Sequence, residues 1–179
     1  MKKLVLAAAL LAVPFAARAE VGLRLGGEAN IAYNNASGTH AITDNWPLSV
    51  DLMLSYWLPT SILSIDAEIA EQFFASTPAG ASGRIGTVFR PGIRLSPPVL
   101  PLYVRGAIPI NIETNCPAGV SSCRETFDLR LGAGFTIPLI LFKIYVEADA
   151  DFPLGGGTNA PSAFSQWALL LNAGLDFRF

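Results

Sequence analysis

The stretch QWALLLNAGLDFRF, residues Gln166–Phe179, alternates apolar with small or polar side chains up to the last residue. Every second residue back from Phe179 is apolar, whereas the positions between include Arg178, Asp176 and Asn172. A period of two is that of a β-strand with one apolar and one polar face. The stretch exceeds the usual soluble strand of about five or six residues and suits a tilted bilayer-spanning strand of roughly 9–11. It therefore predicts a terminal strand, either of a membrane barrel or at the edge of a soluble sheet.

The N-terminus has the parts of a secretory signal peptide. Two lysines precede an apolar run, and Ala17-Arg18-Ala19 fits the small-x-small cleavage pattern. The run is shorter than the roughly 20 residues that a membrane-spanning helix needs. We therefore expect residues 1–19 to be a cleaved signal and residues 20–179 to form one exported domain.

Composition argues against nucleic acid as a partner and against helical membrane spans. The net charge of the 179 residues is −2, and cleavage of the signal would remove only cations, whereas nucleic-acid-binding proteins present a basic face. Apolar residues make up 51% of the chain and charged residues 15%, yet no later segment is a continuous apolar run long enough for a helix span. Among membrane proteins, only a closed barrel remains.

Seven further segments show the same alternation as the last one. We expect strands at residues 21–33, 46–57, 62–74, 84–95, 102–113, 126–137, 143–152 and 166–179. The connections alternate between long and short, with the short ones after the second, fourth and sixth strands. This pattern predicts an all-β, eight-stranded antiparallel up-and-down transmembrane barrel, with both termini at the short-turn end.

The polar faces of these segments combine glycines with charges of both signs. The charged residues expected to form a network inside the barrel are Arg24, Glu28, Asp51, Asp66, Glu68, Arg90, Arg94, Arg105, Asp128, Arg130, Glu147, Asp149 and Asp176. Eight strands leave an interior only just wide enough for side chains, and interleaved guanidiniums and carboxylates offset each other's desolvation. We interpret Asp149 and Asp151, on one strand face, as salt-bridge partners of this network. The opposite orientation, with the apolar face inside, would make a soluble lipocalin-like carrier.

Four residues bear on the details of the strands. Pro91 and Pro109 each remove a ladder donor from a strand interior. Glu71 falls on the apolar face, either close enough to the strand end that a charge costs about 0–1 rather than 2–4 kcal/mol, or at a local bulge. Glu113 is expected on the inward polar face.

Aromatic residues are expected at both ends of the barrel, where the two membrane interfaces favour them. At the long-loop end these are Tyr33, Trp46, Phe73, Phe127, Phe152 and Trp167, and at the other end Tyr56, Phe142, Phe177 and Phe179. With its signal peptide, eight alternating segments and terminal Phe, the chain resembles the small eight-stranded bacterial outer-membrane β-barrel proteins, such as the OmpA transmembrane domain and OmpX. The resemblance implies location in the outer membrane, contact with its lipid and lipopolysaccharide, and an insertion signal (Leu175, Phe177, Phe179) for the outer-membrane assembly machinery.

Few residues are of the types that form disulfides, catalyse reactions or bind metals and cofactors. Cys116 and Cys123 share one loop and, in an oxidising compartment, predict a disulfide. His40 is the single histidine, and with Asp44 and Ser76 it makes only an unspecific set in the outer loops. We expect no cofactor and no metal. The leading hypothesis is a non-enzymatic barrel whose outer loops contact an unidentified surface ligand; a narrow pore, a lipid A-modifying enzyme and the soluble carrier are the alternatives.

Overall fold

Strands form all the regular structure in the computed structural model, which describes residues 20–35, 38–41, 47–59, 62–74, 83–97, 99–114, 128–154 and 166–179. They are β1 (Glu20–Asn35), β2 (Gly38–Ala41), β3 (Pro47–Trp57), β4 (Leu63–Phe74), β5 (Arg84–Leu95), β6 (Leu102–Ala107), β7 (Ile110–Thr114), β8 (Asp128–Pro138), β9 (Lys143–Pro153) and β10 (Trp167–Arg178). Within these ranges, no helix is long and apolar enough to span a membrane.

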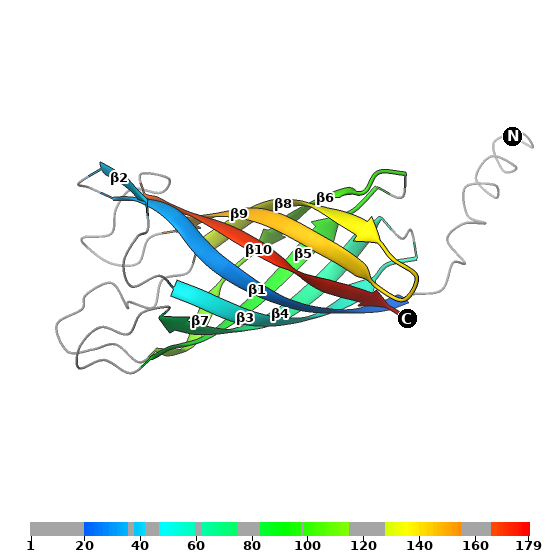
Figure 1. Cartoon of the computed structure of the whole chain (residues 1–179), viewed down its shortest axis with the longest axis horizontal. Coiled ribbons are helices and arrows are strands. Elements are labelled where there is room, and N and C mark those ends of the chain that lie inside the picture. The colour runs from blue at the N-terminus through cyan, green and yellow to red at the C-terminus, as the bar shows by residue number, and fades with distance from the viewer. Residues whose placement is uncertain are drawn as a thin grey trace, which may run out of the picture.

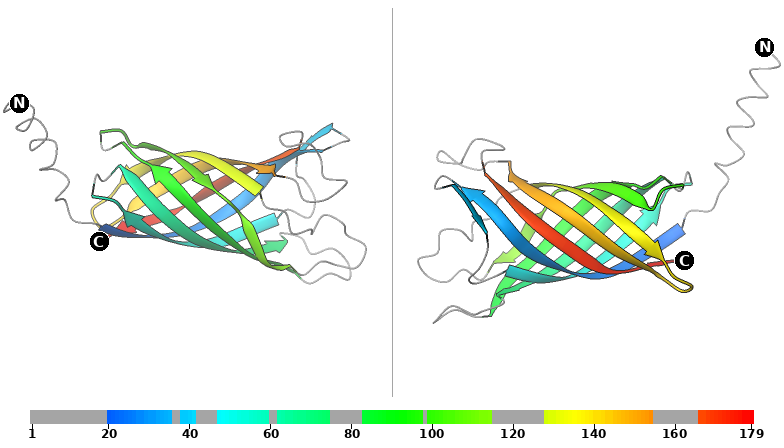
Figure 2. Two further views of the ribbon diagram at one scale, coloured as in Figure 1. Left: turned by 180° about the vertical axis from the view of Figure 1, so that it is seen from behind. Right: turned by 45° about the horizontal axis from the view of Figure 1, so that its top comes forward.

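The strands close into a barrel, as Figures 1 and 2 show. Their order is β10-β9-β8-β6-β5-β4-β3-β1, and β1 also pairs with β10, from Gly22 opposite Arg178 to Asn34 opposite Trp167. All pairings are antiparallel. β6 and β7 both pair with β5, so together they form one of the eight strands of the barrel wall. β2 pairs with β1. The predicted eight-stranded antiparallel barrel is thus confirmed.

The strand expected at residues 102–113 is interrupted between β6 (Leu102–Ala107) and β7 (Ile110–Thr114). Ile108 N donates to Pro91 O (3.0 Å), but Pro91 has no N–H with which to return the bond. The pair therefore keeps one of its two ladder bonds. The interruption lies where the sequence placed Pro91 and Pro109 in adjacent strands.

β2 is an addition to the predicted elements, because residues 34–45 were expected to be a loop. β2 folds back on the end of β1, with Tyr33 opposite His40 and Asn35 opposite Gly38. Gly38 has a φ of 116°, a conformation that side chains other than glycine rarely adopt. β2 therefore pairs with the edge of β1 beyond the last β1–β3 pair, Ala29 opposite Leu48.

A register shift in the β5–β7 ladder moves Glu113 to the outside. Thr87 pairs with Glu113 and the next pair skips Ile112, so that Ile112 and Glu113 are both exposed (61% and, for the Glu113 side chain, 53%). The expectation that Glu113 points inward was wrong. Arg84 donates to Glu113 (2.8 and 2.9 Å) and also bonds Glu71, so the outward charge of Glu71 is paired.

Candidate functional site

The barrel is polar inside and apolar outside. Along β4 the buried residues are Ser64, Asp66, Glu68 and Ala70, whereas Ile65 and Ile69, which alternate with them, are 54% and 49% exposed. Period-two alternation on a closed wall sends every second side chain into the lumen. The site that this fold builds is therefore a charged network in the lumen.

Five arginines and seven carboxylates are buried among the described residues. They are Arg24, Arg90, Arg94, Arg105, Arg130, Glu28, Asp51, Asp66, Glu68, Glu147, Asp149 and Asp176. All belong to the network expected from the sequence; the side chain of Asp128, its remaining member, lies outside what the structure describes. Asp151 joins them through Arg130.

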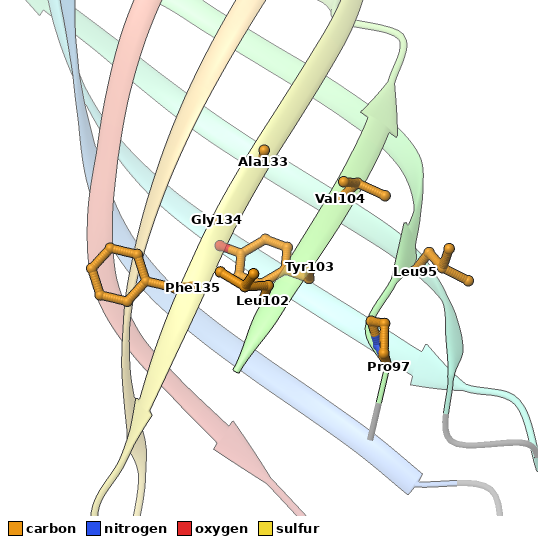
Figure 3. Close-up of a pocket in the computed structure, with 8 residues that line it drawn as sticks. All are labelled: Leu95, Pro97, Leu102, Tyr103, Val104, Ala133, Gly134 and Phe135. Atoms are coloured by element: carbon orange, nitrogen blue, oxygen red, sulfur yellow. The ribbon is translucent and has the colours of Figure 1, made fainter. Parts of the chain in front are cut away.

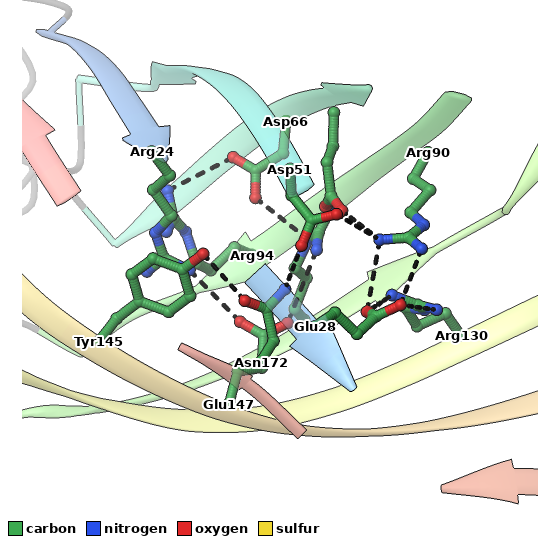
Figure 4. A network of polar contacts seen from close by, with 12 residues as sticks. Arg24, Glu28, Asp51, Asp66, Arg90, Arg94, Arg130, Tyr145, Glu147 and Asn172 are labelled. Carbon is green, nitrogen blue, oxygen red and sulfur yellow. Dashed lines mark hydrogen bonds and ion pairs between the residues drawn. The ribbon is translucent and has the colours of Figure 1, made fainter. Parts of the chain in front are cut away.

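Two arginines join opposite walls in the half of the lumen nearer the long connections. Arg130 on β8 makes a two-pronged pair with Asp151 on β9, with Nε–Oδ1 and Nη2–Oδ2 distances of 2.7 Å, and also bonds Glu28 on β1. Arg90 on β5 donates to Glu28 (2.8 Å) and to Glu68 (2.5 Å). Glu28 thus lies between two guanidiniums from separate strands, which Figure 4 shows. Such two-pronged, charge-assisted bonds fix geometry as well as charge.

The middle of the lumen depends on Arg105 and on the amide of Asn172. Arg105 bonds Glu68 on β4 and lies 3.6 Å from Glu147 on β9. Asn172 Nδ2 donates to Asp51 Oδ2 (3.1 Å). These contacts connect β6 with β4 and β9, and β10 with β3; in each case one strand of the wall lies between the two that are joined.

Arg24 organises the half nearer the short turns. Its Nε donates to Asp176 (3.0 Å), and its Nη1 donates to the Tyr103 hydroxyl (3.1 Å) and to Glu147 (3.3 Å). Its guanidinium carbon also lies 4.6 Å from the ring centre of Tyr103 and 4.3 Å from that of Tyr145. Cation–π contact thus supplements the ion pairs of a desolvated charge.

Trp57 is a lumen residue that the sequence analysis did not assign. Its side chain is 5% exposed, with Arg94 4.8 Å and Arg178 4.0 Å from its ring. The alternation of side chains along the strand could have predicted this position. Trp57 is two residues from the inward-facing Ser55, whereas Tyr56 between them is 50% exposed. Trp57 caps the lumen at the short-turn end.

Glycines make room for the large lumen side chains, as expected for a narrow packed interior. A Cβ on Gly26 would lie 1.9 Å from the Tyr145 hydroxyl oxygen, and one on Gly134 would lie 2.4 Å from both Cζ and the hydroxyl oxygen of Tyr103. Each tyrosine therefore occupies space that a neighbouring residue leaves free.

The outer wall carries a continuous apolar surface. Its most exposed members along the strands are Val50, Leu52, Leu54, Ile65, Ile69, Ile93, Leu102, Val104, Ile112 and Leu131. A hollow of about 430 Å³ lies on this surface beside β5, β6 and β8, where Leu95, Leu102, Val104 and Phe135 line it (Figure 3). On the outward-facing positions of the strands, Glu71, Arg84 and Glu113 interrupt the apolar surface close to the long connections.

The expected interface aromatics take different positions. Tyr56 and Phe73 are exposed, and Phe177 packs against Phe142 with ring centres 5.8 Å apart. Trp46 and Phe127 lie outside the described residues. Of the remaining four, Phe179 is exposed at the C-terminus, and three lie near the long-connection ends of their strands: Tyr33 on β1, Phe152 on β9 and Trp167 on β10.

A bulge interrupts the β1–β10 ladder beside Tyr33. The ladder skips Ile31, and Tyr33 then lies opposite Ala168. Tyr33 is 36% exposed and Ile31 37%, so both side chains remain accessible near the end of β1.

The C-terminal residues extend the seam between β1 and β10. Phe179 N donates to Val21 O (2.9 Å), and Val21 N donates to Phe179 O (3.2 Å). Leu175 is exposed and Phe179 is 76% exposed, so the apolar face of the last strand points out of the barrel.

The residues considered for chemistry are mostly not described. Cys116, Cys123, Asp44 and Ser76 lie outside the described ranges, as does the side chain of His40. The predicted disulfide therefore stays a prediction. In the described part of the chain, no group of three or more His, Cys, Asp and Glu side chains is arranged to hold a metal ion.

The comparisons with known proteins give one structural likeness to report. No protein-family model and no curated protein matches the sequence. The structure is similar to the crystal structure of Neisserial surface protein A (NspA), with a TM-score of 0.57 and 10% sequence identity over 89% of this chain and 97% of that one. At that identity the likeness shows the fold. By its closure, its strand order and this likeness, the chain is an eight-stranded antiparallel barrel of the kind found in Neisserial surface protein A.

Proposed function

We propose that the protein is a non-enzymatic bacterial outer-membrane barrel with a sealed lumen and long connections that meet ligands at the cell surface. The observation that carries this proposal is the inverted distribution of side chains. Leu52 and Ile65 are about half exposed on the outer wall, whereas Arg90 and Glu68 are 1% exposed in the lumen. Lipid is the solvent that favours this arrangement.

The cost of the apolar wall in water supports the membrane location. Complete burial of one such aliphatic side chain is worth about 1.5–3 kcal/mol, and soluble monomers rarely expose large continuous apolar patches. A lipocalin-like carrier would need the apolar face inside, where this barrel has its ion pairs. Neisserial surface protein A, which is a surface protein by its name, has the same fold.

The orientation follows from the connections. The three short connections join the ends of β3, β5 and β8 to the starts of β4, β6 and β9, and these strand ends lie at the same end of the barrel as the C-terminus (Figure 1). In outer-membrane barrels that end faces the periplasm and the long loops face outward. Export by the signal peptide at residues 1–19, insertion by the assembly machinery through the last strand, and lipopolysaccharide around the outer half complete the proposal.

The lumen is proposed to be sealed to ions. Glu28, Arg90 and Arg130 cross it from three strands, and Arg24 fills the half nearer the short turns between two tyrosine rings. A planar-bilayer recording of the refolded barrel is expected to show no steady conductance. Discrete, long-lived current steps would favour the narrow pore instead. The enzymatic alternative predicts that His40→Ala alters the lipid A profile of overexpressing cells, and we expect an unchanged profile.

Membrane fractionation followed by electrophoresis tests the main proposal. We expect the protein in the outer-membrane fraction, extracted only by detergent, and a compact band without boiling that migrates more slowly after boiling. Recovery of folded protein in the soluble periplasmic fraction would overturn the membrane location.

A further inference from the structure

Asp149 is the buried carboxylate for which the described side chains supply no donor. It is 1% exposed, and neither of its oxygens has a hydrogen-bond partner among the described residues. Asp151, two residues further along the same face of β9, makes the two-pronged pair with Arg130. The sequence analysis interpreted both as salt-bridge partners; only Asp151 has an ion pair with a described residue. An ionised carboxylate without a partner at such burial is strongly unfavourable.

The groups nearest to Asp149 make its position clearer. A Cβ on Gly132, which is opposite Asp149 on β8, would lie 2.2 Å from Asp149 Oδ1 and 3.0 Å from Glu147 Oε1. The two oxygens therefore converge on the space above one glycine. Glu147 Oε1 also lacks a hydrogen-bond donor, and its nearest cation is Arg105 at 3.6 Å.

The charges around this pair do not neutralise both acids. Arg130 on β8 faces Asp149 but is already held by Asp151 and Glu28, and Glu28 on β1 adds a negative charge. β10 contributes Leu170 opposite Asp149 and Asn172 opposite Glu147, neither of which is charged. In the part of the chain that the structure describes, five arginines and seven carboxylates are buried in the lumen, so the buried acids outnumber the buried cations.

We propose that Asp149 and Glu147 together bind one proton, so that Asp149 is a carboxylic acid that donates a hydrogen bond to the Glu147 carboxylate above Gly132. Two carboxylate oxygens cannot approach each other favourably unless one carries a hydrogen. The proton belongs on Asp149, because Glu147 also pairs with Arg24 (3.3 Å). A metal ion would serve the same electrostatic need, but the described side chains do not form a cluster that could hold one.

The proton gives β9 a bond that the ion pairs do not provide. It removes one uncompensated negative charge from the interior and turns a repulsive pair into a charge-assisted hydrogen bond. The proton reduces the excess of buried carboxylates over buried arginines, among the described residues, from two to one. This inference concerns the folded barrel, and it holds for the refolded protein in detergent whatever its cellular location.

Substitution by the uncharged isostere tests the proposal. Asp149→Asn keeps a neutral group that can donate to Glu147, so we expect its thermal midpoint in detergent, followed by the heat-dependent gel shift, to stay within about 3 °C of the parent. Asp151→Asn, on the same strand face, is the matched control and should lower the midpoint by roughly 5–15 °C, because Arg130 loses its two-pronged partner. A loss for Asp149→Asn as large as that for Asp151→Asn overturns the proposal.

Infrared spectroscopy of the parent protein provides a readout that needs no stable variant. Isotope-labelled aspartate should show a carboxylic-acid C=O band at neutral pH, and the band should be absent in Asp149→Asn. A spectrum of the parent with only carboxylate bands contradicts a shared proton. Metal analysis of the dialysed barrel is expected to find no stoichiometric ion. A bound ion that is lost in Asp149→Asn would overturn the proposal, because a metal cation and not a proton would then compensate Asp149.

Discussion

Arg90→Met should cost this barrel a large part of its stability, and the structure indicates which contact decides the amount. Arg90 is 1% exposed and pairs with Glu28 (2.8 Å), Glu68 (2.5 Å) and Asp51 (3.5 Å). In the variant, Glu28 keeps Arg130 and Glu68 keeps Arg105. Methionine fills a similar length without a charge. Asp51 is therefore the carboxylate that loses its positively charged partner.

The expected loss follows from the burial of Asp51. Arg90 is the guanidinium with which Asp51 pairs, and after its removal Asp51 retains hydrogen bonds from Ser49 (2.6 Å) and Asn172 (3.1 Å). Removal of one member of a buried ion pair costs about 3–5 kcal/mol, because the remaining charge is uncompensated. The double variant Arg90→Met/Asp51→Asn removes that charge and should recover part of the loss.

Urea titration of the barrel refolded in lipid vesicles measures both effects, with the unboiled compact band as the readout of the folded fraction. Arg178→Met is the control, since Arg178 makes a rim ion pair with Glu20, whose side chain is 41% exposed, and a cation–π contact with Trp57, and each such contact contributes about 0–1 kcal/mol. If Arg90→Met cost less than about 1 kcal/mol, the interior would not behave as the desolvated network described above, and the argument from ion pairing would fail.

Three further predictions use other parts of the chain. Gly26→Ala should destabilise the barrel by about 1–3 kcal/mol in the same titration, because its Cβ would meet a tyrosine hydroxyl at 1.9 Å, whereas Gly27→Ala, whose nearest contact is at 3.3 Å, should be tolerated; equal losses would contradict the packing argument. Leu52→Arg should cost about 2–4 kcal/mol in vesicles if its position is in the bilayer, and an unchanged stability would place that strand in water. Thiol alkylation without reductant should leave the mass unchanged if Cys116 and Cys123 are bonded, and uptake of two labels would disprove the disulfide.

The alternation of side chains made the strands and their faces predictable. The parity of a strand is a local property, so the stretch from Trp167 to Phe179 reveals its two faces without knowledge of its neighbours. For the same reason, the alternation within their own strands was enough to predict that Arg90 and Glu147 face the lumen. Closure followed from the number of such strands and from the need of each strand in lipid to pair on both edges.

What the sequence alone did not decide depends on contacts between strands. The bulges beside Ile31 in β1 and Ile112 in β7, the second of which turns Glu113 outward, are differences in length between paired strands, and no single strand records them. Asp149 and Asp151 have the same parity and the same charge, yet Arg130 from the neighbouring strand reaches only Asp151 as an ion pair. The sequence determined which groups enter the lumen, because alternation is set within each strand. Only the tertiary structure decided which of them meet, because that depends on register and on the distance across the barrel.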